Sequence, residues 1–352
     1  MSFKRKVNRF RGIVMHSLTK HIGRSAFDKE SFKSSNEAIK RVLISRPNSR
    51  LGNQLLITPL VQEVSNIFPD CKIDLFVRGN IAPVLFGNNE NIGRIIRLPK
   101  KPFKELFKYM NVWISLRKYH YDIVINGDQH SSSGRISTQI ANARYKFSGD
   151  IDDELNVRYK DYKHMAKMPI YNLRKDLTDL GLEVENSQIP YLDINLSATE
   201  IQEGKEILQN IVANDKKTIC IYTFATADKC YSPSWWKPFY ERLKEEYAEK
   251  FNILEMLPAE NVSQIDFQAL SYYSRDLREM AAVIQNTEVF ITGDCGVMHL
   301  ASAAHTPTIG LFSVSNLERY KPYNKGSLGI DTNTTDTDGI VREIDKILSA
   351  NI

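Results

Sequence analysis

Long apolar runs are absent from this chain of 352 residues. No stretch of about 18 consecutive apolar residues occurs, so the sequence predicts no membrane-spanning helix. The N-terminus also lacks the uninterrupted apolar core and small-residue cleavage site of a signal peptide, and we expect no export by that route. Cysteine is scarce: the four residues are scattered without metal-ligand spacing. Reduced thiols in a cytoplasmic protein are therefore the expectation.

Several sequence motifs that identify well-known classes of enzyme or cofactor site are missing. The chain has no H-E-x-x-H zinc motif, no Walker lysine loop, no nucleophile elbow and no G-x-G-x-x-G turn. Two D-x-D triplets, at Asp150–Asp152 and Asp336–Asp338, mimic a metal-binding motif. Neither follows a convincing strand, which favours solvated loop acids. The sequence thus predicts no metal site and no cofactor.

Positive charge is concentrated at the start of the chain. Residues 1–40 hold ten Lys/Arg and three Asp/Glu, whereas the rest of the chain holds 37 and 39. Apolar residues from Phe3 to Ile22 recur at three- and four-residue steps, which predicts a basic amphipathic helix over residues 3–24 and a linker to residue 40. Such a helix can contact an anionic membrane surface or pack on the protein body. Nucleic acid is disfavoured because aromatic residues suited to base stacking are sparse.

The segment 41–190 has the alternating strand and helix pattern of an α/β domain. Strands are predicted at 41–45, 72–77, 94–98 and 121–126, and helices at 55–64, 104–118 and 164–182. The segment 191–335 repeats the pattern, with strands at 217–222, 251–255, 289–291 and 308–312 and helices at 234–248, 275–286 and 296–304. A last helix is predicted within 336–352. Two Rossmann-like halves facing a cleft, the GT-B architecture, follow from this pattern, which also suits other two-domain α/β proteins.

The most informative stretch runs from Ile291 to Pro307. Its strand is broken at Gly293–Asp294, a short helix of Met, Leu and Ala follows, and Pro307 ends the helix. Ligands of open α/β sheets lie beyond the carboxyl ends of the strands, where helix N-termini present N–H groups to anions. Asp294 to His299 are expected at such a position.

This stretch resembles the C-terminal signature of glycosyltransferase family 9, the lipopolysaccharide heptosyltransferases. The resemblance is carried by Asp294, Cys295, Gly296, His299, Ala301, Ala303 and Pro307. Further similarities extend from about residue 41 to 323. They include Leu51-Gly52-Asn53 with Thr58-Pro59 for the family's G-D…T-P loop, Tyr121–Asn126 for its Y-D-x-V-I-D strand, and Lys229 for a loop lysine of the second domain. Several motifs in the right order are more specific than any one alone.

The resemblance implies an inverting, metal-independent transfer of a sugar from a nucleotide-diphosphate donor such as ADP-heptose to a lipid-linked or saccharide acceptor. The C-terminal domain would bind the donor through Thr226, Lys229, Asp294, Cys295, Gly296, His299 and Ser315. The N-terminal domain would bind the acceptor through Arg50, Gly52, Asn53 and His130. The implied setting is cytoplasmic, on the inner face of the membrane.

The chemistry of the donor residues agrees with this implication. A leaving nucleoside diphosphate develops negative charge, which Lys229 and the N–H groups at the helix start would stabilise. His299, one turn into the helix, could donate to a phosphate or to the sugar. Structural alternatives remain: His299 could pack under the turn, Lys229 could be a surface lysine, and Asp294 could cap the helix.

Catalysis by inversion also needs a base for the acceptor hydroxyl, and here the chain departs from the family. Asn53 replaces the family's catalytic aspartate and cannot take up a proton. Asp128, with His130 behind it, could serve instead, although it could also be a loop carboxylate facing water. Alternatively, Asn53 only orients an acceptor whose proton leaves by water, or the protein is an inactive nucleotide- or glycan-binding relic. An unrelated two-domain ligand-binding protein is a third hypothesis.

Two further departures concern the donor site. Cys295 replaces the usual Ser or Thr, and its place at a helix N-terminus could lower the pKa of the thiol, although packing as a small residue is favoured. Ser313 follows Phe312 where the family has glycine.

Overall fold

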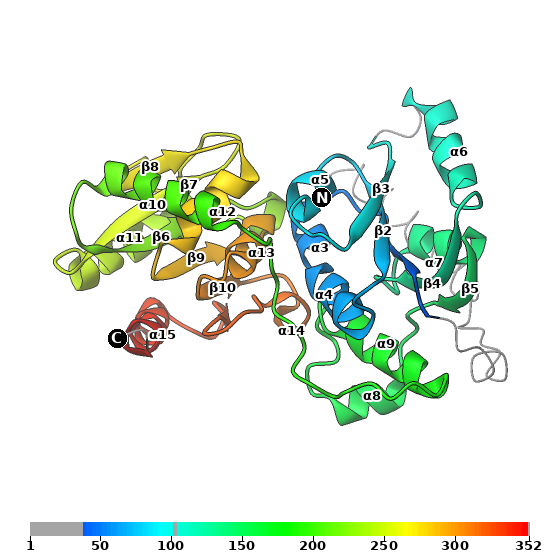
Figure 1. Ribbon diagram of the computed structural model, residues 1–352. Helices are drawn as coiled ribbons and strands as arrows, with labels where there is room; N and C mark the ends of the chain where they lie inside the picture. Colours follow the sequence, from blue (N-terminus) through cyan, green and yellow to red (C-terminus); the bar gives the residue numbers. More distant parts are fainter. Residues whose placement is uncertain (1–37, 101–103, 351–352) are drawn as a thin grey trace. The chain divides into compact units, whose positions relative to one another are not determined.

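The computed structural model describes residues 38–100 and 104–350 (Figure 1). They form two compact units. The first comprises the described residues up to Ser49 together with Pro59–Pro83 and Asn89–Pro190. The second comprises Arg50–Thr58, Val84–Asn88 and the chain from Tyr191 onward. The predicted basic helix at residues 3–24 lies outside the described residues.

The first unit is built on a five-stranded parallel sheet with the order β3-β2-β1-β4-β5. Its strands are β1 (Arg41–Arg46), β2 (Lys72–Arg78), β3 (Ile92–Leu98), β4 (His120–Asn126) and β5 (Asn142–Phe147). Apolar runs on β1 and β4 are buried, as expected for a parallel sheet covered on both faces. The four predicted strands are confirmed, and β5 is an additional one.

Helices connect these strands. After the first strands they are α4 (Thr58–Ile67), α5 (Ala82–Phe86), whose residues from Val84 onward belong to the second unit, and α6 (Leu106–Ser115). In the second half of the first unit they are α7 (Ser132–Ile140), α8 (Asp153–Arg158) and α9 (Met168–Asp179).

The single helix predicted after β1 is wrong, because two helices occupy that segment. A short helix, α3 (Leu51–Leu55), precedes α4. Pro59 has no N–H to donate to the carbonyl of Leu55 four residues earlier, and the hydroxyl of Thr58 donates to that carbonyl instead, at 2.8 Å. The chain therefore ends one helix and begins another.

The second unit contains a six-stranded parallel sheet with the order β11-β10-β9-β6-β7-β8. Its strands are β6 (Lys217–Tyr222), β7 (Phe251–Leu257), β8 (Leu270–Tyr273), β9 (Val289–Gly293), β10 (Thr308–Phe312) and β11 (Leu328–Asp331). Its helices are α10 (Ala198–Val212), α11 (Pro233–Tyr247), α12 (Leu277–Gln285), α13 (Gly296–Ala303), α14 (Leu317–Tyr320) and α15 (Thr337–Ala350), with a 3₁₀ turn, η2, at Ala227–Lys229.

The core of the second unit joins its sheet to two helices. Large side chains of α11, including Trp236 and Phe239, and apolar side chains of α15, including Ile344, pack on inward-facing residues of the strands. On α10, Gly204 permits close contact with α12, because a Cβ there would lie 2.8 Å from the Cβ of Ala282. Helices thus cover the sheet and hold its strands in register.

Both strand orders reverse direction at one point, as in Rossmann-type sheets. The reversal falls between β1 and β4 in the first unit and between β6 and β9 in the second. Loops that leave the carboxyl ends of these neighbouring strands diverge to opposite faces, which is where such sheets bind ligands. The predicted pair of Rossmann-like halves is confirmed.

Candidate active site

The predicted donor residues of the second unit lie at the reversal point of its sheet. Lys229 ends η2 in the loop after β6, and Asp294 follows β9 directly. Because β6 and β9 are paired along Ile219–Tyr222, the loops that follow them start side by side. Thr226, an exposed residue, precedes η2, and the half-buried Ser315 lies in the loop after β10. All of these residues therefore lie at the carboxyl edge of one sheet.

Lys229 and Asp294 form an ion pair at this edge. The Lys229 side chain is 39% exposed and that of Asp294 is 6% exposed, so the lysine covers a buried carboxylate. The Lys229 ammonium also lies 5.8 Å from the ring centroid of Tyr320. The alternative that Asp294 caps the following helix is wrong, because its carboxylate bonds Lys229 and the N-cap residue is Cys295.

The N-terminus of α13 has no side-chain cap from Cys295. The first turn of a helix leaves N–H groups without intrahelical partners, and together with the helix dipole they favour an anion. Burial raises the pKa of the Cys295 thiol, and its sulfur lies 3.6 Å from the hydroxyl of Thr292. The expectation of a lowered thiol pKa is therefore wrong, and the half-buried Cys295 packs beside Thr292.

The start of α3 packs on the start of α13. A Cβ at Gly52 would lie 2.6 Å from Cδ2 of His299 and 3.4 Å from Cα of Gly296. His299 is buried, with 4% of its surface exposed. Glycine is thus required at position 52 for the two backbones to approach. The contact brings the half-buried Asn53, the next residue of α3, close to the donor residues of α13.

The remaining predicted residues are split between the two units. Asp128 follows β4 and forms an ion pair with Arg46, the last residue of β1, whose side chain is 2% exposed. The backbone N–H of His130 donates to Oδ1 of Asp128 at 3.0 Å, while its exposed ring lies 3.1 Å from the amide nitrogen of Gln129. Arg50 is exposed and belongs to the second unit, as the N-cap residue of α3.

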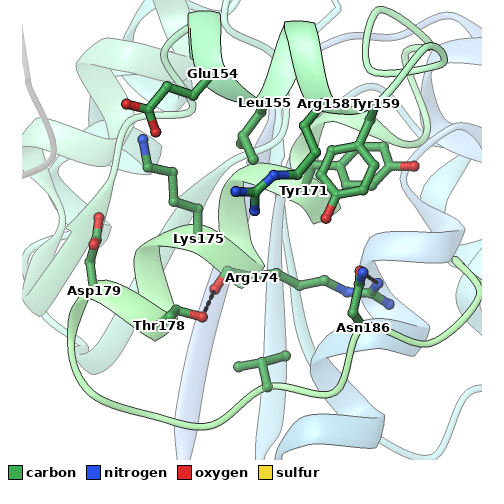
Figure 2. Close-up of a pocket in the computed structure, with 11 residues that line it drawn as sticks. Glu154, Leu155, Arg158, Tyr159, Tyr171, Arg174, Lys175, Thr178, Asp179 and Asn186 are labelled. Carbon is green, nitrogen blue, oxygen red and sulfur yellow. Dashed lines mark hydrogen bonds between the residues drawn. The ribbon is translucent and has the colours of Figure 1, made fainter.

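The first unit also contains a cavity of about 250 Å³ beside α8 and α9, which none of the predicted site residues line. Figure 2 shows Tyr159 and Tyr171 side by side at its wall, with ring centroids 4.1 Å apart. Two of its cations are already paired: Lys175 with Asp152, and Arg174 with Glu63 through two hydrogen bonds. These two ion pairs thus contribute to the stability of this unit, and Arg158 also lines the cavity.

The two D-x-D triplets have structural roles. Asp152 accepts a hydrogen bond from the N–H of Leu155 and caps α8, and Asp336 accepts one from Gly339 at the start of α15. Within residues 38–100 and 104–350, no group of three or more His, Cys, Asp or Glu side chains is placed to hold a metal ion. No helix in these two ranges has the length and apolarity needed to cross a bilayer.

Sequence reasoning missed two residues of this region. Tyr320, at the end of α14, presents its ring to both Lys229 and Arg319. Thr292 donates to the carbonyl of Tyr222 at 2.9 Å and so joins the ends of β9 and β6. A strand ending in Thr-Gly-Asp was a usable signal for Thr292, whereas the contact of Tyr320 spans about ninety residues and leaves no local pattern.

Comparisons with known proteins agree with this architecture. The sequence model of glycosyltransferase family 9 (heptosyltransferase) matches residues 109–339, more than half of the chain. The chain is 21% identical over 300 residues to lipopolysaccharide heptosyltransferase 3 of Escherichia coli, covering 79% of this chain and 85% of that protein.

Solved structures show the same fold. A glycosyltransferase of family 9 from Veillonella parvula aligns with a TM-score of 0.68 at 15% identity, over 89% of this chain and 98% of that one. The E. coli heptosyltransferase WaaC with ADP aligns with a TM-score of 0.62 at 15% identity, over 87% and 99%. With its two Rossmann-type sheets in the GT-B architecture and its match over residues 109–339, the chain belongs to glycosyltransferase family 9, the heptosyltransferases, and is a glycosyltransferase.

Proposed function

We propose that this enzyme is an inverting, metal-independent transferase that moves a heptose-like sugar from a nucleotide-diphosphate sugar to a lipopolysaccharide-type acceptor. The observation that carries the proposal is the grouping of Lys229, Asp294 and the uncapped start of α13 at the reversal point of the second sheet. Relatives support the choice of substrates: one is named a lipopolysaccharide heptosyltransferase, and another was solved with ADP.

The donor diphosphate would lie at the N-terminus of α13. There the N–H groups of the first turn would donate to phosphate oxygens. Gly296 leaves room for Leu51 and Gly52 of α3 beside this turn. Lys229, paired with Asp294 before the donor binds, would share its charge with the diphosphate. The stabilisation from this positive charge increases as the sugar–phosphate bond breaks, because negative charge then develops on the leaving group. His299, held by its contact with Gly52, would orient the phosphate or the sugar.

The base for the acceptor hydroxyl is proposed to be Asp128. It is a carboxylate at the reversal point of the first sheet, and the buried guanidinium of Arg46 holds it in position. Asn53 cannot accept the proton, but its side-chain oxygen can orient the acceptor hydroxyl by a hydrogen bond. Thr226 and Ser315 would complete the donor site, and Arg50 and His130 would contact the acceptor.

A second candidate function is an inactive relic that still binds nucleotide or glycan, and Asn53 is the observation that favours it. We infer in addition that the enzyme works in the cytoplasm at the inner membrane surface. The basic residues of segment 3–24 are the reason for this inference, since an anionic, lipid-embedded acceptor would be presented there.

The decisive experiment is transfer from ADP-heptose to truncated lipopolysaccharide, followed by ADP release and product mass. Wild type, Asp128→Asn and Asn53→Asp are compared, with and without EDTA. We expect wild-type turnover that EDTA leaves unchanged, an inverted anomeric centre in the product, and a loss of at least about a hundredfold in kcat for Asp128→Asn. Absence of turnover in wild type together with its recovery in Asn53→Asp would identify the relic instead.

A further inference from the structure

The helix α6, at the outer edge of the first unit in Figure 1, carries apolar residues both on the side that packs on the sheet and on a side exposed to solvent. Its inner face carries Tyr109, Val112 and Trp113, which pack on the buried cluster around Leu43 and Phe76. The rings of Trp113 and Phe76 meet edge to face, with centroids 5.3 Å apart. These contacts attach the helix to the sheet.

The exposed side of the helix carries four large apolar side chains that are in contact with solvent. Leu106 is 56% exposed, Phe107 88%, Met110 51% and Ile114 53%. Phe107, Met110 and Ile114 are spaced three and four residues apart and therefore share one side of the helix. A contiguous exposed apolar patch marks an interaction surface, whereas single exposed apolar residues need no explanation. We call these four residues the α6 outer face.

Positively charged residues are frequent in the sequence before and after α6. Between Glu90 and Asp122 the sequence has eight Lys and Arg and a single acid, Glu105. A groove of about 560 Å³ opens beside the start of α6, and its lining includes Arg97, Lys100 and Lys108. Lys108 also pairs with Glu105 at the exposed start of the helix. Apolar side chains bordered by cations are the pattern of a helix that lies in a membrane interface.

We propose that the α6 outer face docks on the surface of an anionic lipid bilayer. Phe107, Met110 and Ile114 enter the boundary between headgroups and acyl chains, and the lysines and arginines beside them contact lipid phosphates. This contact is separate from the sugar-transfer site, and it does not depend on the identity of the donor or the acceptor.

The positive charge near α6 argues against two other binding partners for the α6 outer face. A second copy of the chain, packed by two-fold symmetry, would place the same cations opposite one another. Residues 1–40, with ten Lys/Arg and three Asp/Glu, would likewise bring positive charge to a positive surface. A bilayer with anionic headgroups matches both the apolar patch and the charge.

The test is partition of the full chain onto vesicles of phosphatidylcholine, alone or mixed with phosphatidylglycerol. Phe107→Glu is compared with the matched control Val157→Glu, a substitution on α8 of a side chain that is 84% exposed. We expect Phe107→Glu to lower binding to the mixed vesicles about tenfold or more and Val157→Glu to change it less than about twofold. Met110→Glu should repeat the loss, Phe107→Trp should retain binding, and added salt should weaken it.

Three results would overturn the proposal. Equal binding by Phe107→Glu and Val157→Glu would show that another part of the chain carries any membrane contact. Absence of binding, or equal binding of wild type to neutral and mixed vesicles, would exclude an anionic bilayer as the occupant. A wild-type dimer in sedimentation that Phe107→Glu converts to a monomer would show that a second copy covers the face.

Discussion

At the scale of single residues, the candidate site depends on two features around α13: the ion pair of Lys229 with Asp294 and the packing of Gly52 beside His299. Lys229 neutralises the buried carboxylate of Asp294, so a donor diphosphate would compete with that carboxylate for the same ammonium group. In the proposed site, this competition would make the ammonium group of Lys229 available where the diphosphate binds and would keep it paired with Asp294 otherwise. Gly52 contributes to the packing around α13, because its missing side chain lets α3 approach the ring of His299.

Gly52→Ala tests the packing of α3 on α13. The new Cβ would lie 2.6 Å from the His299 ring, and the buried ring or the start of α3 must move. We expect kcat/KM to fall at least about tenfold, because small displacements of positioning groups are costly in a preorganised site. Gly293→Ala is the control, since its Cβ would make an ordinary contact of 3.4 Å with Tyr231. Equal kinetics for Gly52→Ala and wild type would contradict the role given to this contact.

Much of this residue-scale arrangement was predictable from the sequence. Asp294, Gly296 and His299 lie within six positions, so a strand–turn–helix pattern places them together. Lys229 could be assigned to the site only from the family resemblance, because its loop is brought near Asp294 by the pairing of β6 with β9. The ion pair between them, and that between Arg46 and Asp128, could not be predicted, since residues distant in sequence have no local signature of a contact.

At the scale of elements, half-buried charges hold helices to their neighbours. Arg278 of α12 binds both carboxylate oxygens of Glu200 on α10 and the backbone carbonyls of Val84, Ile194 and Asn195. The hydrogen bonds from Arg278 lower the pKa of Glu200 to about 2. One guanidinium thus joins three helices, α12, α10 and α5, and the loop segment at Ile194–Asn195 within the second unit.

Arg278→Ala should lower the free energy of unfolding by about 2–4 kcal/mol at neutral pH. The pKa of Glu200 is depressed in the folded state, so its stabilisation is complete above its ordinary value of 4.5 and is lost as the pH falls toward about 2. The difference between wild type and variant should therefore shrink in acid, as measured by urea unfolding across that range. Arg275→Ala, an exposed neighbour, is the control, and a difference independent of pH would contradict the assignment.

A second element-scale prediction concerns α9. Burial, reinforced by the nearby Asp179, raises the pKa of Asp176 to about 7 from an ordinary value of 3.8. The folded state then holds the proton more tightly than the unfolded state, so stability falls as the pH rises from about 4 through 7.

Asp176→Asn should remove this decline and stabilise the protein by about 2 kcal/mol or more at pH near 8, with little effect near pH 4. Thermal unfolding of wild type and variant across this range is the measurement. Asp179→Asn, exposed on the same helix, should give a smaller effect. Parallel curves for wild type and Asp176→Asn would show that the Asp176 carboxyl does not titrate in this range.

Elements were predicted best where apolar runs are long and buried. β1, β4, β6 and β9 fit that description, and all four were found. The missed strands β8 and β11 are four residues long; β8 is largely exposed, and β11 has a single buried residue. Only two of the six residues of β5 are buried. Such edge strands are defined by pairing with a neighbour, which a single sequence does not reveal.

At the scale of the whole molecule, the two sheets repeat one strand order, and each places its candidate residues at the reversal point. The alternation of strands and helices was sufficient to predict two Rossmann-like halves. It did not predict that Arg50–Thr58, inside the first half by sequence, belongs with the second unit. That grouping arises from the contact of α3 with α13, some 240 residues later in the chain.

The most direct test of the account is thermal stabilisation by ADP, UDP, GDP and CMP, measured on wild type, Lys229→Ala and Lys237→Ala. Lys237 is the matched control, because it also forms an ion pair in the second unit, with Asp266, and its side chain is 42% exposed. A ligand at a hundred times its Kd stabilises by about 2.7 kcal/mol, a clearly measurable shift. The account predicts that one nucleoside diphosphate stabilises wild type and Lys237→Ala but not Lys229→Ala. Equal stabilisation of all three proteins, or of none, would contradict a donor site at Lys229 and α13.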